Sequence, residues 1–146
     1  EKDLDNLLGG ICKELHNELR VNICADQLKS FNKLRKPMDI VIQHMVSMGK
    51  DFDEARSRVT DFLFLPLDSQ MFQSDFIFTD QEAKNLMIKR SFTFKDIQCE
   101  SHYFDIQDFL REKASRIGLN HRIYFDLVWN DRYKSSGTNL FLTNPS

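Results

Sequence analysis

Apolar residues recur at every third or fourth position in the first part of the chain. They are Leu4, Leu8, Ile11, Leu15 and Leu19. This spacing places the side chains on one face of a helix, so the pattern predicts a helix over residues 3–20. The stripe covers little more than two heptads. We expect it to pack on the chain's own core, or to form a seam with a second copy or a partner helix.

Two more helices are expected before residue 50. Leu28, Phe31 and Leu34 predict a short helix that ends at Pro37, because the residue before a proline avoids helical backbone angles. Pro37 also suits the first turn of a following helix, and Gly49 suits its end. The residues expected on the buried face of that second helix are Met38, Val41, Ile42, Met45 and Met48.

Helix-capping patterns mark three later helices. Asp51 with Glu54, and Thr79 with Glu82, have the spacing of capping boxes. The first predicts a helix over residues 52–63, which ends before Pro66. Asp105 is expected to cap a third helix, which Gly118 ends.

Alternation of apolar and polar residues predicts four strands, over residues 76–78, 91–94, 123–129 and 140–142. The last two are expected to pair as an antiparallel hairpin. The predicted fold class is therefore α+β: a helical N-terminal half, about residues 3–64, packed with a small, mostly antiparallel sheet and two further helices. We expect residues 1–146 to form a single domain excised from a larger protein, with a weak sub-boundary near 66–69.

Composition narrows the class of partner. The formal charge is −2, so the whole-chain charge favours neither nucleic acid nor an anionic membrane. The three cysteines, Cys12, Cys24 and Cys99, are scattered along the chain, which is typical of a reducing compartment. No apolar run approaches the length of a membrane-spanning helix. We therefore expect an intracellular location, cytoplasmic or nuclear, and no membrane partner.

Two groups of residues have the chemistry of a metal site. Cys12, His16, Cys99 and His102 would make a tetrahedral zinc ligand set, although neither pair has the usual two-cysteine spacing. The other reading of these residues is a buried helix cysteine with incidental neighbours.

The second group loosely resembles the PD-(D/E)xK nuclease pattern, in which clustered carboxylates hold Mg²⁺. It consists of Asp68 followed by Glu82 and Lys84, with Leu67 where the pattern has proline. Helix capping also accounts for Glu82. We expect no catalytic residue, no metal and no cofactor, and the sequence leans away from an enzyme.

Basic residues cluster at two places. Lys29, Lys33, Arg35 and Lys36 surround Phe31, and Arg132 and Lys134 lie in the turn between the strands predicted over 123–129 and 140–142. Such residues neutralise phosphates, and neighbouring aromatic rings stack on bases. The helices over 38–48 and 52–63 would form a helix-turn-helix with the later hairpin as a wing.

Two functions follow from these patterns. The first is a non-enzymatic protein-interaction or oligomerisation domain of a larger intracellular protein, in which Leu4, Leu8, Ile11, Leu15 and Leu19 form the interaction stripe. Its partner is another protein or a second copy. The alternative is a nucleic-acid-binding domain with a winged-helix-like form, in which Lys29, Lys33, Arg35, Lys36, Arg132 and Lys134 contact the nucleic acid.

Overall fold

The computed structural model of the protein describes residues 2–23 and 28–126, and these form helices, turns and coil without a β-strand. The expected α+β class is therefore wrong: the described part of the chain is helical. The elements in chain order are α1 (Lys2–Leu19), α2 (Phe31–Met48), the 3₁₀ helix η2 (Lys50–Phe52), α3 (Arg56–Thr60), α4 (Ser69–Gln73), α5 (Asp80–Asn85) and α6 (Glu100–Arg116).

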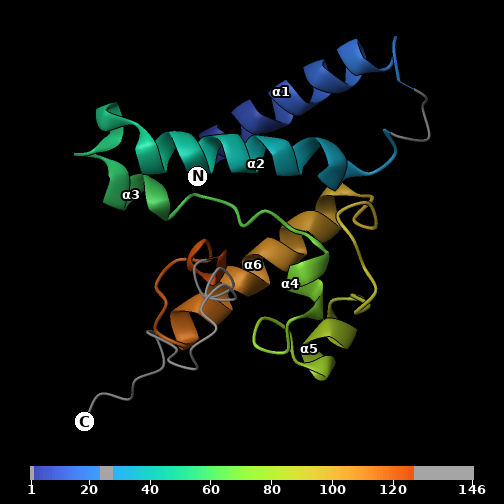
Figure 1. The fold of residues 1–146 in the computed structure, drawn as a ribbon, viewed down its shortest axis with the longest axis vertical. Coiled ribbons are helices and arrows are strands. Elements are labelled where there is room, and N and C mark those ends of the chain that lie inside the picture. Colours follow the sequence, from blue (N-terminus) through green and yellow to red (C-terminus); the bar gives the residue numbers. More distant parts are fainter. Residues whose placement is uncertain (1, 24–27, 127–146) are drawn as a thin grey trace, which may run out of the picture.

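The helices lie in two layers (Figure 1). Helices α1 and α2 form one layer and cross each other, while α6 runs diagonally through the other layer beside α4 and α5. The chain between α3 and α4 passes between α2 and α6. The core includes Leu65 from this connection, Phe72 from α4, and Tyr103 and Leu110 from α6, all fully buried.

The connection between the layers, residues 62–67, is named here the central segment. It is coil for most of its length, yet Leu63, Phe64, Leu65 and Leu67 are all buried. Its peptide groups are satisfied by side chains instead of a neighbouring strand. The amide of Gln107 accepts from the Leu65 N–H at 3.1 Å and donates to the Leu65 carbonyl at 2.7 Å.

Two more buried side chains serve the central segment. Asn32 Nδ2 donates to the Leu67 carbonyl at 3.0 Å, and Arg122 Nε donates to the Leu63 carbonyl at 2.8 Å. Buried backbone groups must be paired, and these side chains supply the pairing that a sheet would otherwise give. This explains why polar residues are buried here.

The first two predicted strands are turns. In 76–78, Ile77 and Phe78 are both buried, so they do not alternate, and the Phe78 N–H donates to the Ser74 carbonyl at 3.0 Å. In 91–94, the Asp96 carboxylate accepts from the Thr93 N–H at 2.7 Å and from the Thr93 hydroxyl at 2.8 Å. Local side-chain to backbone bonding of this kind competes with strand pairing.

The strand predicted over 123–129 is also wrong in its described part. Tyr124–Asp126 are helical, and the Asp126 N–H donates to the Ile123 carbonyl at 3.0 Å. Ile123 and Phe125 are nevertheless buried. Residues 127–129 and 140–142 lie outside the described residues.

The helix α2 is continuous where two helices were predicted. Pro37 lies inside it and is exposed, so α2 spans residues 31–48 without a break. The predicted end at Gly49 is confirmed. A proline inside a helix costs about 3 kcal/mol. The hydrogen bonds of Asn32 and of the Arg35–Asp39 pair, together with the burial of Val46, offset this cost.

Some of the other helix boundaries lie where the capping residues predict them, and others do not. The capping box of Thr79 and Glu82 is formed, and Gly118 ends α6 with φ of 77°. The helix predicted over 52–63 is reduced to α3, with Ala55 before it in place of the Asp51 cap. The N-cap of α6 is Cys99, six residues before the predicted cap Asp105, so the helix begins at Glu100.

Candidate interaction surface

The predicted stripe of α1 is used mainly inside the molecule. Leu8 and Cys12 are buried against α2, where the sulfur of Cys12 lies 3.2 Å from that of Met38. Leu15 and Leu19 are half-buried. Ile11 remains 42% exposed, and the side chain of Leu4 lies outside the described part.

Helix α2 presents its polar side to the core. Asn32, Arg35 and Asp39 are buried, with Val46 the only apolar residue on that face that is fully buried. The sequence-based prediction had placed Val41, Met45 and Met48 in the core, and all three are exposed, by 56%, 54% and 77%. The prediction is wrong for these three residues, whereas Met38 and Ile42 of the same predicted face are half-buried and Ile42 packs against the core. Arg35, Asp39 and Val46 occupy the buried row of α2, so the opposite row points outward.

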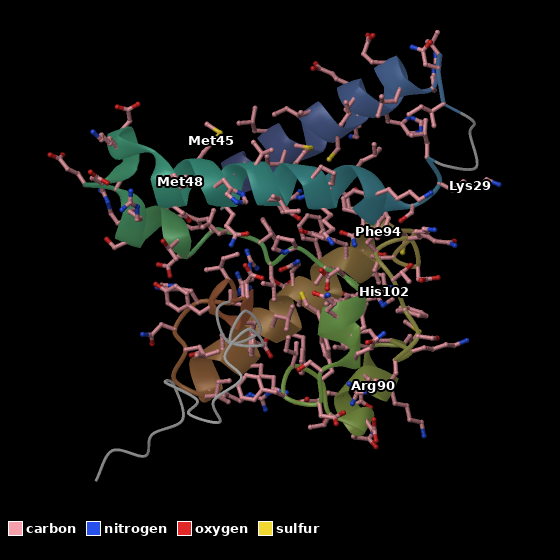
Figure 2. The ribbon with its side chains drawn as sticks, viewed as in Figure 1. Lys29, Met45, Met48, Arg90, Phe94 and His102 are labelled. Atoms are coloured by element: carbon pink, nitrogen blue, oxygen red, sulfur yellow. The ribbon has the colours of Figure 1, made fainter. Side chains whose placement is uncertain are left out.

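Val41, Met45 and Met48 share one face, because a helix turns once in about 3.6 residues. Figure 2 labels Met45 and Met48 towards the end of α2 that meets α3. This face borders α1, since Met38, on the adjacent row of α2, contacts Cys12.

Helix α1 adds two exposed apolar side chains beside this face of α2. Leu7 is 59% exposed and Ile11 42% exposed. They lie on the flank of α1 away from α6, since Gly9 and His16 on the opposite flank line a groove of about 410 Å³ that extends to Glu100 at the start of α6. We name the resulting surface the outer α1–α2 face. Its residues are Leu7, Ile11, Val41, Met45 and Met48.

The α2 part of this face is uncharged. Between Pro37 and Gly49 the only Asp, Glu, Lys or Arg is Asp39, and it is buried. His44 is exposed and its ring bonds to the Ile40 carbonyl at 2.7 Å. Depletion of charged residues is the compositional signal of the core of a protein interface.

The buried side of α2 holds a polar network. Asp39 accepts from the Arg35 Nε at 2.9 Å and from the Tyr103 hydroxyl at 2.5 Å. The guanidinium of Arg35 lies 4.5 Å from the Phe64 ring centre, and its two terminal nitrogens have no hydrogen-bond partner among the described residues. Burial raises the pKa of Asp39 to about 6, against the opposing effect of Arg35.

The predicted basic cluster is divided by the fold. Arg35 is fully buried and therefore faces no ligand, while Lys36 pairs with Asp68 at 3.3 Å. Lys29 is exposed and Lys33 half-buried, and Figure 2 shows Lys29 at the far end of this layer from Met48. The loop after α5 brings Phe94 beside Lys36, with 5.6 Å between the ammonium and the ring centre. Arg132 and Lys134 lie outside the described residues.

The four candidate zinc ligands have other contacts. Cys12 is buried against Met38, and the His102 Nε2 lies 2.7 Å from the Leu86 carbonyl oxygen. Cys99 is exposed, and bonding from the Ser101 hydroxyl and the His102 N–H lowers the pKa of its thiol. Among residues 2–23 and 28–126, no three His, Cys, Asp or Glu side chains come together as a metal site.

The carboxylates of the nuclease-like pattern cap helices. Asp68 accepts from the N–H groups of Gln70 and Met71 at the start of α4. Glu82 accepts from the Thr79 N–H at 2.8 Å and from the Lys113 ammonium at 2.6 Å. These contacts hold the pKa of Glu82 below its usual value although partial desolvation opposes them.

Fold and surface together define a small helical domain with an exposed apolar face, and the α2 part of that face is uncharged. No protein-family model, curated protein or solved structure matches the chain. None of the helices in the described segments combines the length and apolarity needed to cross a membrane.

Proposed function

We propose that this chain is a non-enzymatic protein-interaction or oligomerisation domain of a larger intracellular protein, and that it binds through the outer α1–α2 face. One observation carries the proposal: α2 directs polar side chains into the core and Val41, Met45 and Met48 into solvent. Leaving large apolar side chains in water gives no folding energy, whereas covering them with a partner stabilises the complex.

The intracellular location is supported by the state of two thiols. Cys12 and Cys99 are both unpaired, and Cys99 is exposed. An exposed free thiol is typical of a reducing compartment, because an oxidising one would modify or pair it.

The experiment compares two matched methionines. Met48 is 77% exposed on the outer α1–α2 face, and Met87 is 73% exposed in the turn after α5. We expect Met48→Glu to abolish association, whether with another protein or with a second copy, because the interface would bury an unpaired carboxylate. Met87→Glu should associate like the original chain in co-purification from its source cells and in light scattering. Equal association of both variants would refute the proposal.

Nucleic-acid binding is the second candidate, without the winged-helix form. The observation that favours it is the half-buried ring of Phe94 near two ammonium groups, with Lys36 at 5.6 Å and Lys95 at 6.0 Å from the ring centre. An aromatic ring flanked by cations fits a single-stranded backbone and its bases. Phe94→Ala with Lys95→Ala should then weaken binding of a single-stranded oligonucleotide and flatten its salt dependence. No binding of the original chain at low salt would exclude this candidate.

A further inference from the structure

A groove of about 410 Å³ lies on the flank of α1 opposite the outer α1–α2 face. Small-molecule sites in proteins have volumes of roughly 300–1,000 Å³, so this groove is large enough for one small ligand. It is lined by residues of α1 between 9 and 17, by residues between 28 and 34, and by residues 98 and 100 at the start of α6. We name it the α1–α6 groove, and Figure 2 labels Lys29 beside it.

The apolar residues of the groove lie deepest. Cys12 and Leu28 are buried, and Phe31 and Leu34 are half-buried. Phe31 packs edge-on against Tyr103 of α6, with 5.4 Å between the ring centres, which holds its ring in place. A ligand with an apolar body would therefore be removed from water against a surface that is already formed.

The charged side chains of the groove are mostly basic. Among the Asp, Glu, Lys, Arg and His residues that line its described walls, three are basic and one is acidic: Lys13, His16, Lys29 and Glu100. Lys13, Lys29 and Glu100 are exposed, so they stand at the rim. Such a rim favours a negative charge over a positive one.

Gly9 leaves room in the α1 wall. A Cβ at this position would have no atom within 4 Å, so close packing inside the molecule does not require the glycine. A side chain added there would enter the groove and occupy part of its volume. Gly10 also faces open space, but it is exposed and does not line the groove. Glu14 and Glu18 of the same helix likewise lie outside the walls.

We propose that the α1–α6 groove binds a small carboxylic acid with an apolar body, with the carboxylate at Lys13 and the body against Phe31 and Leu34. The volume selects a small molecule, the deep apolar residues select its body, and the basic majority at the rim selects its charge. Glu100 repels an anion, so its removal should have the opposite effect to the removal of Lys13. The site goes beyond the proposed function, because the outer α1–α2 face has no part in it.

Three probes with one body and different head groups test the class of ligand. They are 4-phenylbutyrate, 4-phenylbutanol and 4-phenylbutylamine, each titrated into the ¹⁵N-labelled chain at neutral pH and followed by amide NMR shifts. Ligands of this size bind with a Kd on the order of 1 mM. The butyrate should bind about 3–5-fold more tightly than the alcohol, and the amine more weakly than the alcohol.

Matched variants test the site. Lys13→Met should weaken butyrate binding by about 3–5-fold and leave alcohol binding unchanged, because it removes only the charge. Glu100→Gln should strengthen butyrate binding by about twofold. Gly9→Leu should abolish binding of all three probes by filling the groove, whereas Gly10→Leu should bind like the original chain. Circular dichroism checks that both leucine variants keep their helix content, as the helix propensity of leucine predicts.

Equal or tighter binding of the amine would overturn the carboxylic acid as the ligand. Butyrate binding that survives Gly9→Leu would overturn the groove as the site, and so would shifts confined to amides outside its walls. No shift with any probe at roughly 10 mM would overturn both. Association through the outer α1–α2 face is measured separately with Met48→Glu, so either proposal can fail while the other stands.

Discussion

At the scale of single residues, Asp39 is held where its charged form is costly. It is only 3% exposed and packs among groups from several elements. Arg35 on α2, Tyr103 on α6, Arg122 beyond α6 and Cys12 on α1 interact with it electrostatically. Burial is the largest effect, and it raises the pKa of this carboxyl from 3.8 to about 6.

The Asp39 titration is a direct prediction. Carbon NMR of the side-chain carboxyl should give a midpoint near pH 6. Arg35→Met should move the midpoint higher, because the guanidinium favours the ionised form. Lys36→Met, one residue along and paired instead with Asp68, should leave it unchanged. A midpoint near 4 in the original chain would contradict the burial of this carboxyl.

The same pKa sets the sign of one pH effect on stability. Because the folded pKa lies above the unfolded value, the contribution of Asp39 to stability is complete below about pH 3.8 and is lost as pH rises through about 6. The capped carboxylates of Glu82 and Asp96 have lowered pKa values. Their contribution has the opposite sign, because it is lost as pH falls through those lowered values.

At the scale of elements, the continuity of α2 through Pro37 carries the next prediction. Pro37 has no N–H to donate to the Lys33 carbonyl, and its ring crowds that turn. Pro37→Ala should therefore raise the free energy of unfolding by about 1–3 kcal/mol, after allowance for the greater freedom of the unfolded chain. Urea denaturation measures this.

The control for that comparison is Ser47→Ala, at an exposed position of the same helix, which should change stability by less than about 0.5 kcal/mol. A loss of stability in Pro37→Ala would contradict the cost assigned to this proline inside α2.

Elements with self-contained signals could be predicted from the sequence. The Thr79–Glu82 box and the Gly118 stop depend only on residues within one turn of each other, and both are present. The α1 helix is confirmed because its apolar period is regular. The strands over 76–78 and 91–94 failed for the converse reason, since short alternation does not reveal the Ser74 and Asp96 contacts that form turns there.

At the scale of the whole molecule, Gln107 joins the two layers. Its amide accepts from and donates to Leu65, the fully buried residue in the middle of the central segment. Gln107→Ala would leave both backbone groups of Leu65 buried without a partner. We expect a loss of about 2–4 kcal/mol in the free energy of unfolding.

Gln73→Ala, at an exposed site at the end of α4, is the matched control and should be nearly neutral. Thermal or urea unfolding compares the two variants. Equal stabilities would mean that water or a rearranged side chain replaces the Gln107 amide, and the central segment would then lie less deeply buried than the structure has it.

The candidate surface could be predicted only in part. The residues of α2 were recognised as an apolar face, but that face was assigned to the core. The inward direction of Arg35 and Asp39 depends on Tyr103, which lies 64 positions after Asp39 in the chain. Helical periodicity contains no information about such a distant partner. The sequence therefore predicts which residues share a face of α2, but not whether that face points into the core or into solvent.

The side-chain pairing of the central segment has a consequence for how the chain can be divided. Asn32 and Arg122 bond this segment from positions far to either side of it. In a fragment that lacks Asn32 or Arg122, the Leu67 or Leu63 carbonyl would be buried without its hydrogen-bond donor. A polypeptide cut between these two residues should therefore be less stable than the whole chain, because each piece lacks a hydrogen-bond partner that the segment needs.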